Sequence, residues 1–345
     1  MRLSGGMNYL IKSILVIFLK TTIVRVSTEN TPVFCRVHNH LYICVNEGNS
    51  LETIGFENAQ AVETIDDVEL HLESLDIVDM SEHVFWNVRN STALYMSEND
   101  MGVIRKYYFQ AVDQLTYLDL KNNGISHIED GAFASLTNLE TLLLDGNNIT
   151  QLGSAIWRGL SSLRELYATN NSIVLKKNIF RGLRQLETLA LDANEISDIP
   201  MGTFNGLPHM DLLYLSRNKI MTIHQDVFRG LMELNELDLS KNQITFIPSG
   251  LFRNMGSLDS LWLNLNRLTT LQAGIFDGLH NLSLLFLSGN DLDLIDLSVF
   301  RMMARVSIEP GFIIDGSFTT NFTGINGFLR CETTTTQDPY TCEEV

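Results

Sequence analysis

The chain has 345 residues, and its 24 basic residues against 41 acidic ones give it a formal net charge of −17 at pH 7. Such an acidic chain lacks the basic surface that binding to phosphates requires, so we expect no nucleic-acid partner. By length alone, the chain would divide into two or three domains.

Residues 1–27 are interpreted as a secretory signal peptide. An apolar run at residues 13–19 follows Arg2 and Lys12, and polar residues begin at Thr28. This order of charged, apolar and polar segments is typical of export signals. A membrane anchor is the alternative, but it needs about 20 uninterrupted apolar residues, and Lys20 ends this run. We therefore expect a secreted, extracellular protein with no membrane span in its mature form.

Residues 67–302 form an internal repeat with a period of 24 residues, shortened to 23 in one copy. Each copy follows the frame L-x-x-L-x-L-x-x-N-x-I. The ten copies begin at Asp67, Ser91, Leu115, Leu139, Leu163, Leu186, Met210, Leu234, Leu258 and Leu282. A unit of this size cannot bury its own apolar face, so successive units must stack. The repeat therefore predicts one continuous solenoid instead of separate domains.

Two columns of the repeat are interpreted as core. One is asparagine: Asn99, Asn123, Asn147, Asn171, Asn194, Asn218, Asn242, Asn266 and Asn290. Buried amides at a turn can pair with backbone donors and acceptors that would otherwise have no partner. The other column is aromatic and should stack behind the strands: Phe85, Phe109, Phe133, Trp157, Phe180, Phe204, Phe228, Phe252, Phe276 and Phe300. Because Asn99 lies near the end of the array, we expect it to contribute less to stability than the central Asn218.

Residues 28–66 and 303–345 are predicted to be caps that close the two ends of the solenoid. Cys35 and Cys44 lie in the first, and Cys331 and Cys342 lie in the second. Ten strands stacked at about 4.8 Å hold the ends too far apart for a disulfide between them, which needs Cα atoms within about 7 Å. We therefore predict Cys35–Cys44 and Cys331–Cys342 disulfides. Zinc binding is the alternative, but this ligand spacing suits it poorly.

The candidate binding surface is the exposed face of the strands. Side chains alternate along a strand, so the residue between two strand leucines faces solvent. Half of the residues at this position are aromatic, and apolar neighbours gather near the C-terminal end. The predicted binding residues are Tyr95, Tyr167, Leu212, Tyr214, Trp262, Leu265, Leu284 and Phe286. Exposed aromatic clusters are typical of protein-binding hot spots. The alternatives are that these rings stabilise the sheet through cross-strand pairs or that the C-terminal cap covers them.

The N-terminal repeats are strongly acidic, with no basic residue between Arg36 and Arg89. The acidic residues there include Glu63, Asp66, Asp67, Glu69, Glu73, Asp76, Asp79 and Glu82. This stretch is either a solvated face or a docking surface for a basic partner. Glu69, His71 and Glu73 share one strand face and are a possible metal set, but exposed charges beside a strand leucine rarely bind metal. We predict no metal site, no cofactor and no catalytic residues.

Five N-x-S/T tripeptides are candidate glycosylation sites, as expected for a secreted protein. Their asparagines are Asn90, Asn148, Asn170, Asn281 and Asn321.

The chain resembles extracellular leucine-rich repeat proteins of the typical 24-residue class. The repeat frame carries the resemblance, together with F-x-G-L segments such as Phe180–Leu183 and Phe228–Leu231. The resemblance implies an α/β solenoid with a curved parallel sheet on its concave face and short helical or irregular segments on its convex face. Family caps usually hold four cysteines each, whereas each cap here holds two.

Among these relatives, the chain is most similar to Toll-receptor ectodomains and to secreted insect leucine-rich immune proteins that lack a coiled coil. The resemblance implies a recognition or adaptor role in innate immunity, with a protein partner bound at the concave face. An extracellular matrix or adhesion role is the alternative. The recognition surface varies between members of this family, so no functional residue is carried over from it.

Overall fold

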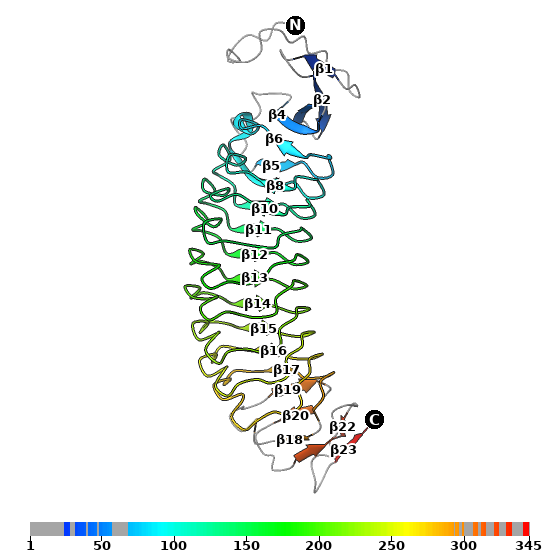
Figure 1. Cartoon of the computed structure of the whole chain (residues 1–345), viewed down its shortest axis with the longest axis vertical. Coiled ribbons are helices and arrows are strands. Elements are labelled where there is room, and N and C mark those ends of the chain that lie inside the picture. Colours follow the sequence, from blue (N-terminus) through cyan, green and yellow to red (C-terminus); the bar gives the residue numbers. More distant parts are fainter. Residues whose placement is uncertain are drawn as a thin grey trace.

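The computed structural model describes residues 24–27, 32–38, 41–46, 48–56, 68–292, 294–296, 299, 306–309, 312–314, 321–323, 329–332 and 341–344. Most of the predicted signal peptide, the acidic residues Glu63, Asp66 and Asp67, and Phe300 lie outside these ranges. The described residues wind into an elongated, curved solenoid with β1 (Val24–Ser27) towards one pole and β23 (Thr341–Glu344) towards the other (Figure 1). No helix within the described ranges has the length and hydropathy to cross a bilayer.

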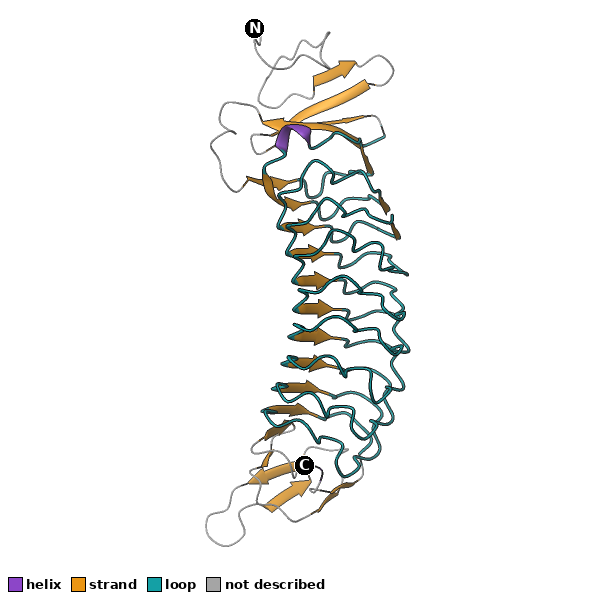
Figure 2. Ribbon diagram, turned by 90° about the vertical axis from the view of Figure 1, so that its left-hand side faces the viewer, coloured by secondary structure: helices purple, strands orange, loops and turns teal. Residues whose placement is uncertain are grey.

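A twelve-stranded sheet runs the length of the solenoid. Its strands, in spatial order, are β5 (Val68–His71), β7 (Ser91–Tyr95), β9 (Tyr117–Asp119), β11 (Thr141–Leu143), β12 (Glu165–Tyr167), β13 (Thr188–Ala190), β14 (Leu212–Tyr214), β15 (Glu236–Asp238), β16 (Ser260–Trp262), β17 (Leu284–Phe286), β19 (Val306–Glu309) and β20 (Phe312–Ile314). The strands line the inner side of the curve, and loops form the outer side (Figure 2). The predicted parallel sheet on the concave face is confirmed.

The register of the sheet follows the repeat frame. Leu213 of β14 pairs with Leu237 of β15, 24 residues later, and the strand residues on either side keep the same offset. In the shortened repeat, Leu166 of β12 pairs with Leu189 of β13, 23 residues later. The deletion is therefore absorbed in the loops, and the strands remain aligned. Ten parallel strands from β5 to β17 are joined by nine turns of the solenoid.

The outer side contains almost no helix, so of the helical or irregular segments expected there, the irregular ones are observed. Within the repeats described in full, residues 68–292, the helical element is the 3₁₀ helix η2 (Trp86–Val88). A short parallel pair, β8 (Val103–Ile104) and β10 (His127–Ile128), adds a second small sheet. Gly159 illustrates one cause in the fourth repeat, because it has a φ of +95° and a residue in the left-handed region ends a helical turn. A Cβ on Gly159 would also lie 2.4 Å from the carbonyl oxygen of Ala134.

The aromatic column forms a buried spine, as predicted. Its nine described rings are at most 2% exposed. Neighbouring rings stack: Phe204 and Phe228 have centroids 5.8 Å apart, and Trp157 and Phe180 have centroids 6.4 Å apart. The strand leucines pack against the spine and are themselves buried. One apolar core thus runs continuously from repeat to repeat.

The asparagine ladder is also confirmed, since all nine side chains are buried. Asn218 is representative. Its Nδ2 donates to the carbonyl oxygens of Leu191 and Leu215 at 2.9 and 3.1 Å. Its Oδ1 accepts a hydrogen bond of 3.1 Å from the backbone N–H of Ile196 in the preceding repeat. Each amide therefore joins two turns of the solenoid and satisfies backbone groups that would otherwise be buried without partners.

Short strands flank the solenoid at both ends. At the N-terminal end, β1 (Val24–Ser27), β2 (Pro32–His38), β3 (Leu41–Asn46), β4 (Ser50–Phe56) and β6 (Asp79–Met80) form a five-stranded sheet. At the C-terminal end, β18 (Leu294–Asp296) pairs with β21 (Asn321–Thr323), and β22 (Leu329–Glu332) pairs with β23 (Thr341–Glu344). Within the predicted C-terminal cap, β19 pairs parallel with β17 and extends the large sheet.

The cysteines occupy opposing positions in these end strands. Cys35 of β2 lies opposite Cys44 of β3, and Cys331 of β22 lies opposite Cys342 of β23. Opposite residues of an antiparallel pair have Cα atoms about 4.5–5.5 Å apart, which is within the range of a disulfide. The register is compatible with the predicted disulfides, which stay a prediction.

Candidate functional site

The strand pattern determines which side chains reach the concave surface. In β14, Leu213 is buried in the core, whereas Leu212 and Tyr214 on either side of it are half-buried on the opposite face. The same alternation places four further predicted residues half-buried on this face: Tyr95, Tyr167, Trp262 and Phe286. Tyr95 belongs to an aromatic group towards the N-terminal end of the sheet, and Trp262 and Phe286 form another towards the C-terminal end, with Tyr167 and Tyr214 between the two groups.

The N-terminal aromatic group consists of His71, Tyr95 and Tyr117. The rings of His71 and Tyr95 stack with centroids 4.5 Å apart and planes 3° apart. The rings of Tyr95 and Tyr117 follow at 5.0 Å. Tyr117 was not among the predicted binding residues. It lies two residues before the position between the two strand leucines, at the repeat position where Leu212 and Leu284 were predicted, so the aromatic residue there was a detectable signal.

His71 is held between two carboxylates. Its Nδ1 lies 2.9 Å from Glu73 Oε1, and its Nε2 lies 3.4 Å from Glu69 Oε2. The hydrogen bond with Glu73 raises the pKa of His71, burial opposes this shift, and Glu69 adds to it. Both imidazole nitrogens of His71 therefore contact carboxylates. These belong to Glu69 and Glu73, the two other residues of the possible metal site named from the sequence.

The middle of the concave face is less aromatic. Leu143 and Ala190 occupy the same repeat position as the rings but are buried by their neighbours. Tyr214 donates a hydrogen bond of 2.8 Å to Glu236 on the next strand. Burial and this carboxylate raise the pKa of Tyr214. The phenol of Tyr214 thus remains protonated and directed at Glu236 at physiological pH.

The C-terminal aromatic group consists of Trp262 and Phe286. Their rings stack with centroids 5.3 Å apart and planes 6° apart. Leu284, on the same strand as Phe286, is 39% exposed. Leu265, which was predicted to join this group, lies outside the sheet. It follows β16 in a turn with a φ of +56°, and its Cδ2 lies beside Gly289 of the next turn.

Carboxylates surround both aromatic groups. The concave positions of the strands and of the residues just after them carry Glu69, Glu73, Asp119, Asp145, Glu165, Asp192, Glu236 and Asp238. Lys121 is the basic residue at equivalent positions of the described repeats, and it pairs with Asp119 at 3.6 Å. Burial is the main cause that raises the pKa values of Asp119 and Asp238. Burial also raises the pKa of Tyr117 to about 12, with Asp119 contributing. The concave face is therefore aromatic and acidic together.

A shallow hollow lies where the chain enters strands β13 to β15. It is lined by Gln185, Glu187, His209, Asp211 and Glu233. His209 Nδ1 lies 3.1 Å from Glu233 Oε2. Burial raises the pKa of Asp211, and the nearby Glu236 and Glu187 add to the shift. The hollow thus continues the acidic character of the concave face around its edge.

Four of the five predicted glycosylation sites have exposed asparagines: Asn90, Asn148, Asn170 and Asn281. The side chain of Asn321 lies outside the described residues. All four exposed asparagines lie outside the strands of the large sheet. Glycans at these positions would leave the centre of the concave face accessible.

The leucine rich repeat family profile matches residues 113–173, 184–244 and 232–292. The chain is a leucine-rich repeat protein. No curated protein matches the sequence significantly. Leucine-rich repeat proteins generally act as binding scaffolds, which agrees with the expectation of a binding surface on this chain.

Three solved structures share the solenoid of this leucine-rich repeat protein. A leucine-rich repeat protein from Leptospira interrogans is 23% identical with a TM-score of 0.59, covering 68% of this chain and 58% of that one. TLR13, in a complex with ssRNA13, is 21% identical with a TM-score of 0.57, covering 72% of this chain and 40% of that one. An internalin (inlF) from Listeria monocytogenes is 23% identical with a TM-score of 0.54, covering 72% and 68%. At these identities the likeness shows the fold alone.

Proposed function

We propose that this leucine-rich repeat protein is a secreted recognition or adaptor protein that binds a protein partner through its concave face. The observation that carries the proposal is the pair of half-buried ring stacks, Tyr95 with His71 and Tyr117, and Trp262 with Phe286. Large rigid rings exclude water over a wide area at a small cost in conformational entropy, and they dominate the energetics of protein interfaces.

The carboxylates and rings of the concave face also indicate which kind of partner surface would bind there. Carboxylates lie between and around the ring stacks, with Lys121 as the basic residue among them. A partner whose contact surface carries basic and apolar side chains would neutralise this charge and cover the rings. An acidic polymer such as RNA would be repelled from the same surface. The acidic docking surface for a basic partner was predicted for the N-terminal repeats. We therefore propose that this acidic surface continues along the concave sheet.

Several features support secretion. The N-terminal segment has the order of charges typical of an export signal, the cysteines lie opposite one another in paired strands, and four glycosylation motifs are exposed. Expression in cultured animal cells tests this part of the proposal. We expect the protein in the medium, with a mass that falls on enzymatic removal of N-glycans. Retention inside the cell without glycans would refute it.

A role in innate immunity rests on the resemblance to Toll-receptor ectodomains and secreted insect immune proteins. A matrix or adhesion role is the second candidate, favoured by the same exposed aromatic surface. Fractionation of the native tissue distinguishes the two. A recognition protein is expected in the soluble extracellular fluid and should increase after microbial challenge, whereas a matrix component should stay in the insoluble fraction.

Affinity capture tests the binding site directly. The secreted protein serves as bait in its native fluid, beside a bait carrying Trp262→Ala and Tyr214→Ala and a control bait carrying Phe246→Ala. Phe246 is 43% exposed but lies outside the sheet, so its loss removes a comparable ring from another surface. A partner captured by the natural and control baits and lost from the double variant supports the concave face. Equal capture by all three would refute it.

A further inference from the structure

The middle of the solenoid is basic on its outer side, although the chain as a whole is acidic. Between residues 146 and 186 the single acidic residue is Glu165, and it lies in β12 of the concave sheet. The same segment holds six basic residues: Arg158, Arg164, Lys176, Lys177, Arg181 and Arg184. The loops of the fourth and fifth repeats therefore carry positive charge with no acidic residue between them.

Five of these residues form a surface that we call the basic flank: Arg158, Lys176, Lys177, Arg181 and Arg184. All five are exposed. Within the described part of the chain, none of the five takes part in an ion pair, whereas Arg164, Lys219 and Arg253 pair with acidic residues of neighbouring turns. Asp145 and Glu187 flank this segment in the sequence. The cations of the basic flank are therefore exposed and without ion-pair partners among the described residues.

The repeat brings these cations together on two adjacent turns, the fourth and the fifth. Arg158 and Arg181 follow the stacked rings of Trp157 and Phe180, so they occupy equivalent places in adjacent repeats. Arg158 Nη1 lies near Gly131 of the turn before, and Lys177 Cε lies near Gly202 of the turn after. The two turns that carry the basic flank lie about 4.8 Å apart along the solenoid.

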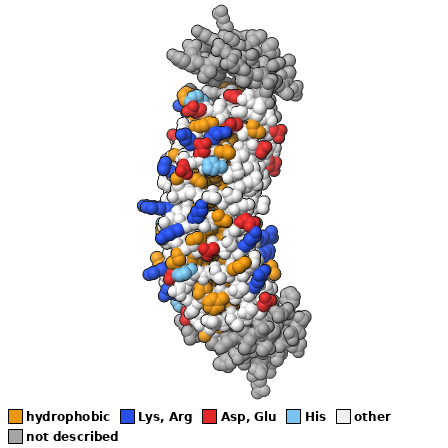
Figure 3. Space-filling view, viewed as in Figure 1, with side chains coloured by type: hydrophobic (Ala, Val, Ile, Leu, Met, Phe, Trp, Pro, Cys, Tyr) orange, Lys and Arg blue, Asp and Glu red, His pale blue; other side chains and the backbone are white. Residues whose placement is uncertain are grey.

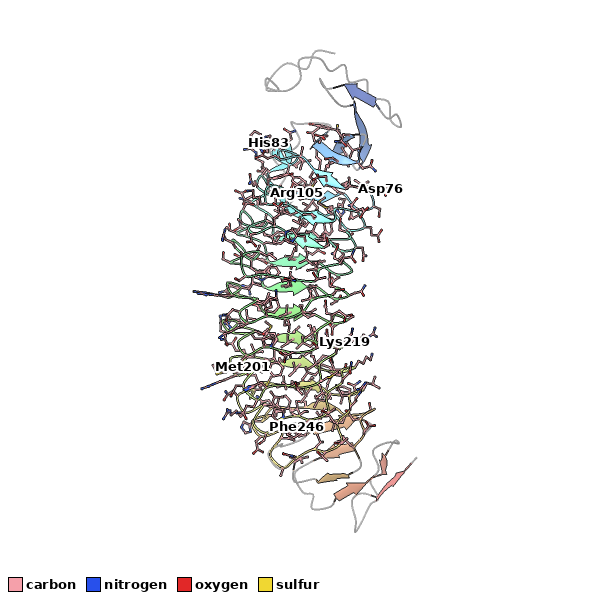
Figure 4. The ribbon with its side chains drawn as sticks, viewed as in Figure 1. Asp76, His83, Arg105, Met201, Lys219 and Phe246 are labelled. Atoms are coloured by element: carbon pink, nitrogen blue, oxygen red, sulfur yellow. The ribbon has the colours of Figure 1, made fainter. Side chains whose placement is uncertain are left out.

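The figures show the same grouping. Lys and Arg side chains gather along the left-hand side of the middle turns in Figure 3. Met201, which precedes Gly202, marks this side in Figure 4, and Lys219 marks the opposite side. The basic flank is thus separate from the concave sheet and does not compete with a partner bound there.

We propose that the basic flank binds a sulfated polysaccharide. Arginine and lysine bind sulfate oxygens through charge-assisted hydrogen bonds, and a row of cations matches a linear chain that carries sulfate groups at regular intervals. The net charge of −17 opposes binding of a polyanion to the chain as a whole, so we expect binding where the cations lack acidic partners, at this flank.

Two other anionic partners fit the surface less well. Single-stranded nucleic acid binds through rings on which its bases stack, and the nearest rings, Trp157 and Phe180, are buried. A membrane surface is flat, whereas the outer side of the solenoid curves away from a plane (Figure 2). A flexible polysaccharide can follow that curve and contact the cations of both turns.

Binding of the full chain to heparin, measured by calorimetric titration and by the salt concentration for elution from a heparin column, tests the proposal. The test variant changes Lys176, Lys177, Arg181 and Arg184 to Gln. The control variant changes Lys106, Arg217, Lys241 and Arg267 to Gln, which removes the same charge from exposed cations elsewhere. We expect the natural protein and the control to bind heparin and the test variant to bind at least about tenfold more weakly, with a smaller salt dependence.

Chemically desulfated heparin, a single-stranded DNA oligonucleotide and phosphatidylserine vesicles complete the comparison. Weaker binding to all three than to heparin supports recognition of sulfate on a polysaccharide. Equal weakening of both variants would show a general effect of charge and overturn the proposal, as would tighter binding to DNA or vesicles. Because all eight substitutions lie at exposed positions, matching melting curves check that each variant is folded.

Discussion

The indole of Trp262 lies flat against the ring of Phe286 on the neighbouring strand, with centroids 5.3 Å apart. The strand leucines next to them, Leu261 and Leu285, point into the core and are at most 1% exposed. The two rings therefore cover the outer surface of the sheet without filling the core. Their loss should change what the surface can bind more than how stable the solenoid is.

Trp262→Ala tests this separation of binding from stability. We expect a loss of about 2 kcal/mol or more in affinity for the captured partner, because a central aromatic anchor is removed. The melting temperature should hardly change, since the side chain is half-exposed. Titration calorimetry and a thermal melt measure the two quantities on the same sample. Unchanged affinity would indicate that the ring pair only stabilises the sheet.

Phe228→Ala should have the opposite effect. Phe228 is fully buried in the aromatic spine and stacks on Phe204 at 5.8 Å. Removal of this ring leaves a cavity in a continuous core and should cost about 3–5 kcal/mol of unfolding free energy. Chemical denaturation provides the measurement. A loss as small as that of Trp262→Ala would mean that neighbouring repeats collapse into the space.

The regular part of this fold was predictable because one pattern dictates it ten times. The leucine spacing determines which side chains enter the core, and the asparagines and rings recur wherever the solenoid must satisfy or fill its interior. For the outer loops the sequence left both helical and irregular segments open, and a glycine with positive φ favours an irregular segment because it ends a helical turn. Gly159 and Gly182 have φ values of +95° and +115° and end such turns.

The site was predictable in outline only. Strand alternation placed Tyr95, Tyr214 and Trp262 on the concave face, as the structure has them. Leu265 was misplaced because a residue just before the ladder asparagine belongs to the turn, where its φ is +56°. Tyr117 was missed because the contact with Tyr95 depends on the lateral register of two strands. A comparison of residues at one position of the repeat does not reveal contacts between different positions on neighbouring strands.

The asparagines of the ladder should differ in how much each contributes to the stability of the solenoid. Asn218→Leu should cost about 1–3 kcal/mol, because it leaves buried backbone groups without partners. Asn99 was expected to contribute less, but its Oδ1 accepts from the backbone N–H groups of both Leu75 and Ile77. We therefore expect Asn99→Leu to cost as much as Asn218→Leu. The Oδ1 of Asn123 has no hydrogen-bond partner, so Asn123→Leu should cost less than either. Denaturation of the three variants gives the order, and equal losses would contradict it.

The cysteine register gives a chemical prediction. Mass spectrometry of the unreduced, secreted protein should find Cys35 linked to Cys44 and Cys331 linked to Cys342, with no free thiol. Removal of a native disulfide typically costs about 2–5 kcal/mol, so Cys→Ser at either pair should reduce secretion. A link between the two ends of the chain would contradict the extended solenoid.

The environment of His71 gives a pH prediction. The hydrogen bond with Glu73 raises the pKa of His71 above its ordinary value of about 6.5. The contribution of this charged pair to stability is therefore fully present below about pH 6.5 and is lost as the pH rises through the folded-state pKa. NMR titration of the imidazole should show the raised pKa, and Glu73→Gln should lower it. Glu82→Gln, an exposed acidic residue outside this strand, is the control. An unchanged pKa in Glu73→Gln would mean that the carboxylate does not hold the ring, and the His71–Tyr95 stack would then be the contact that orients it.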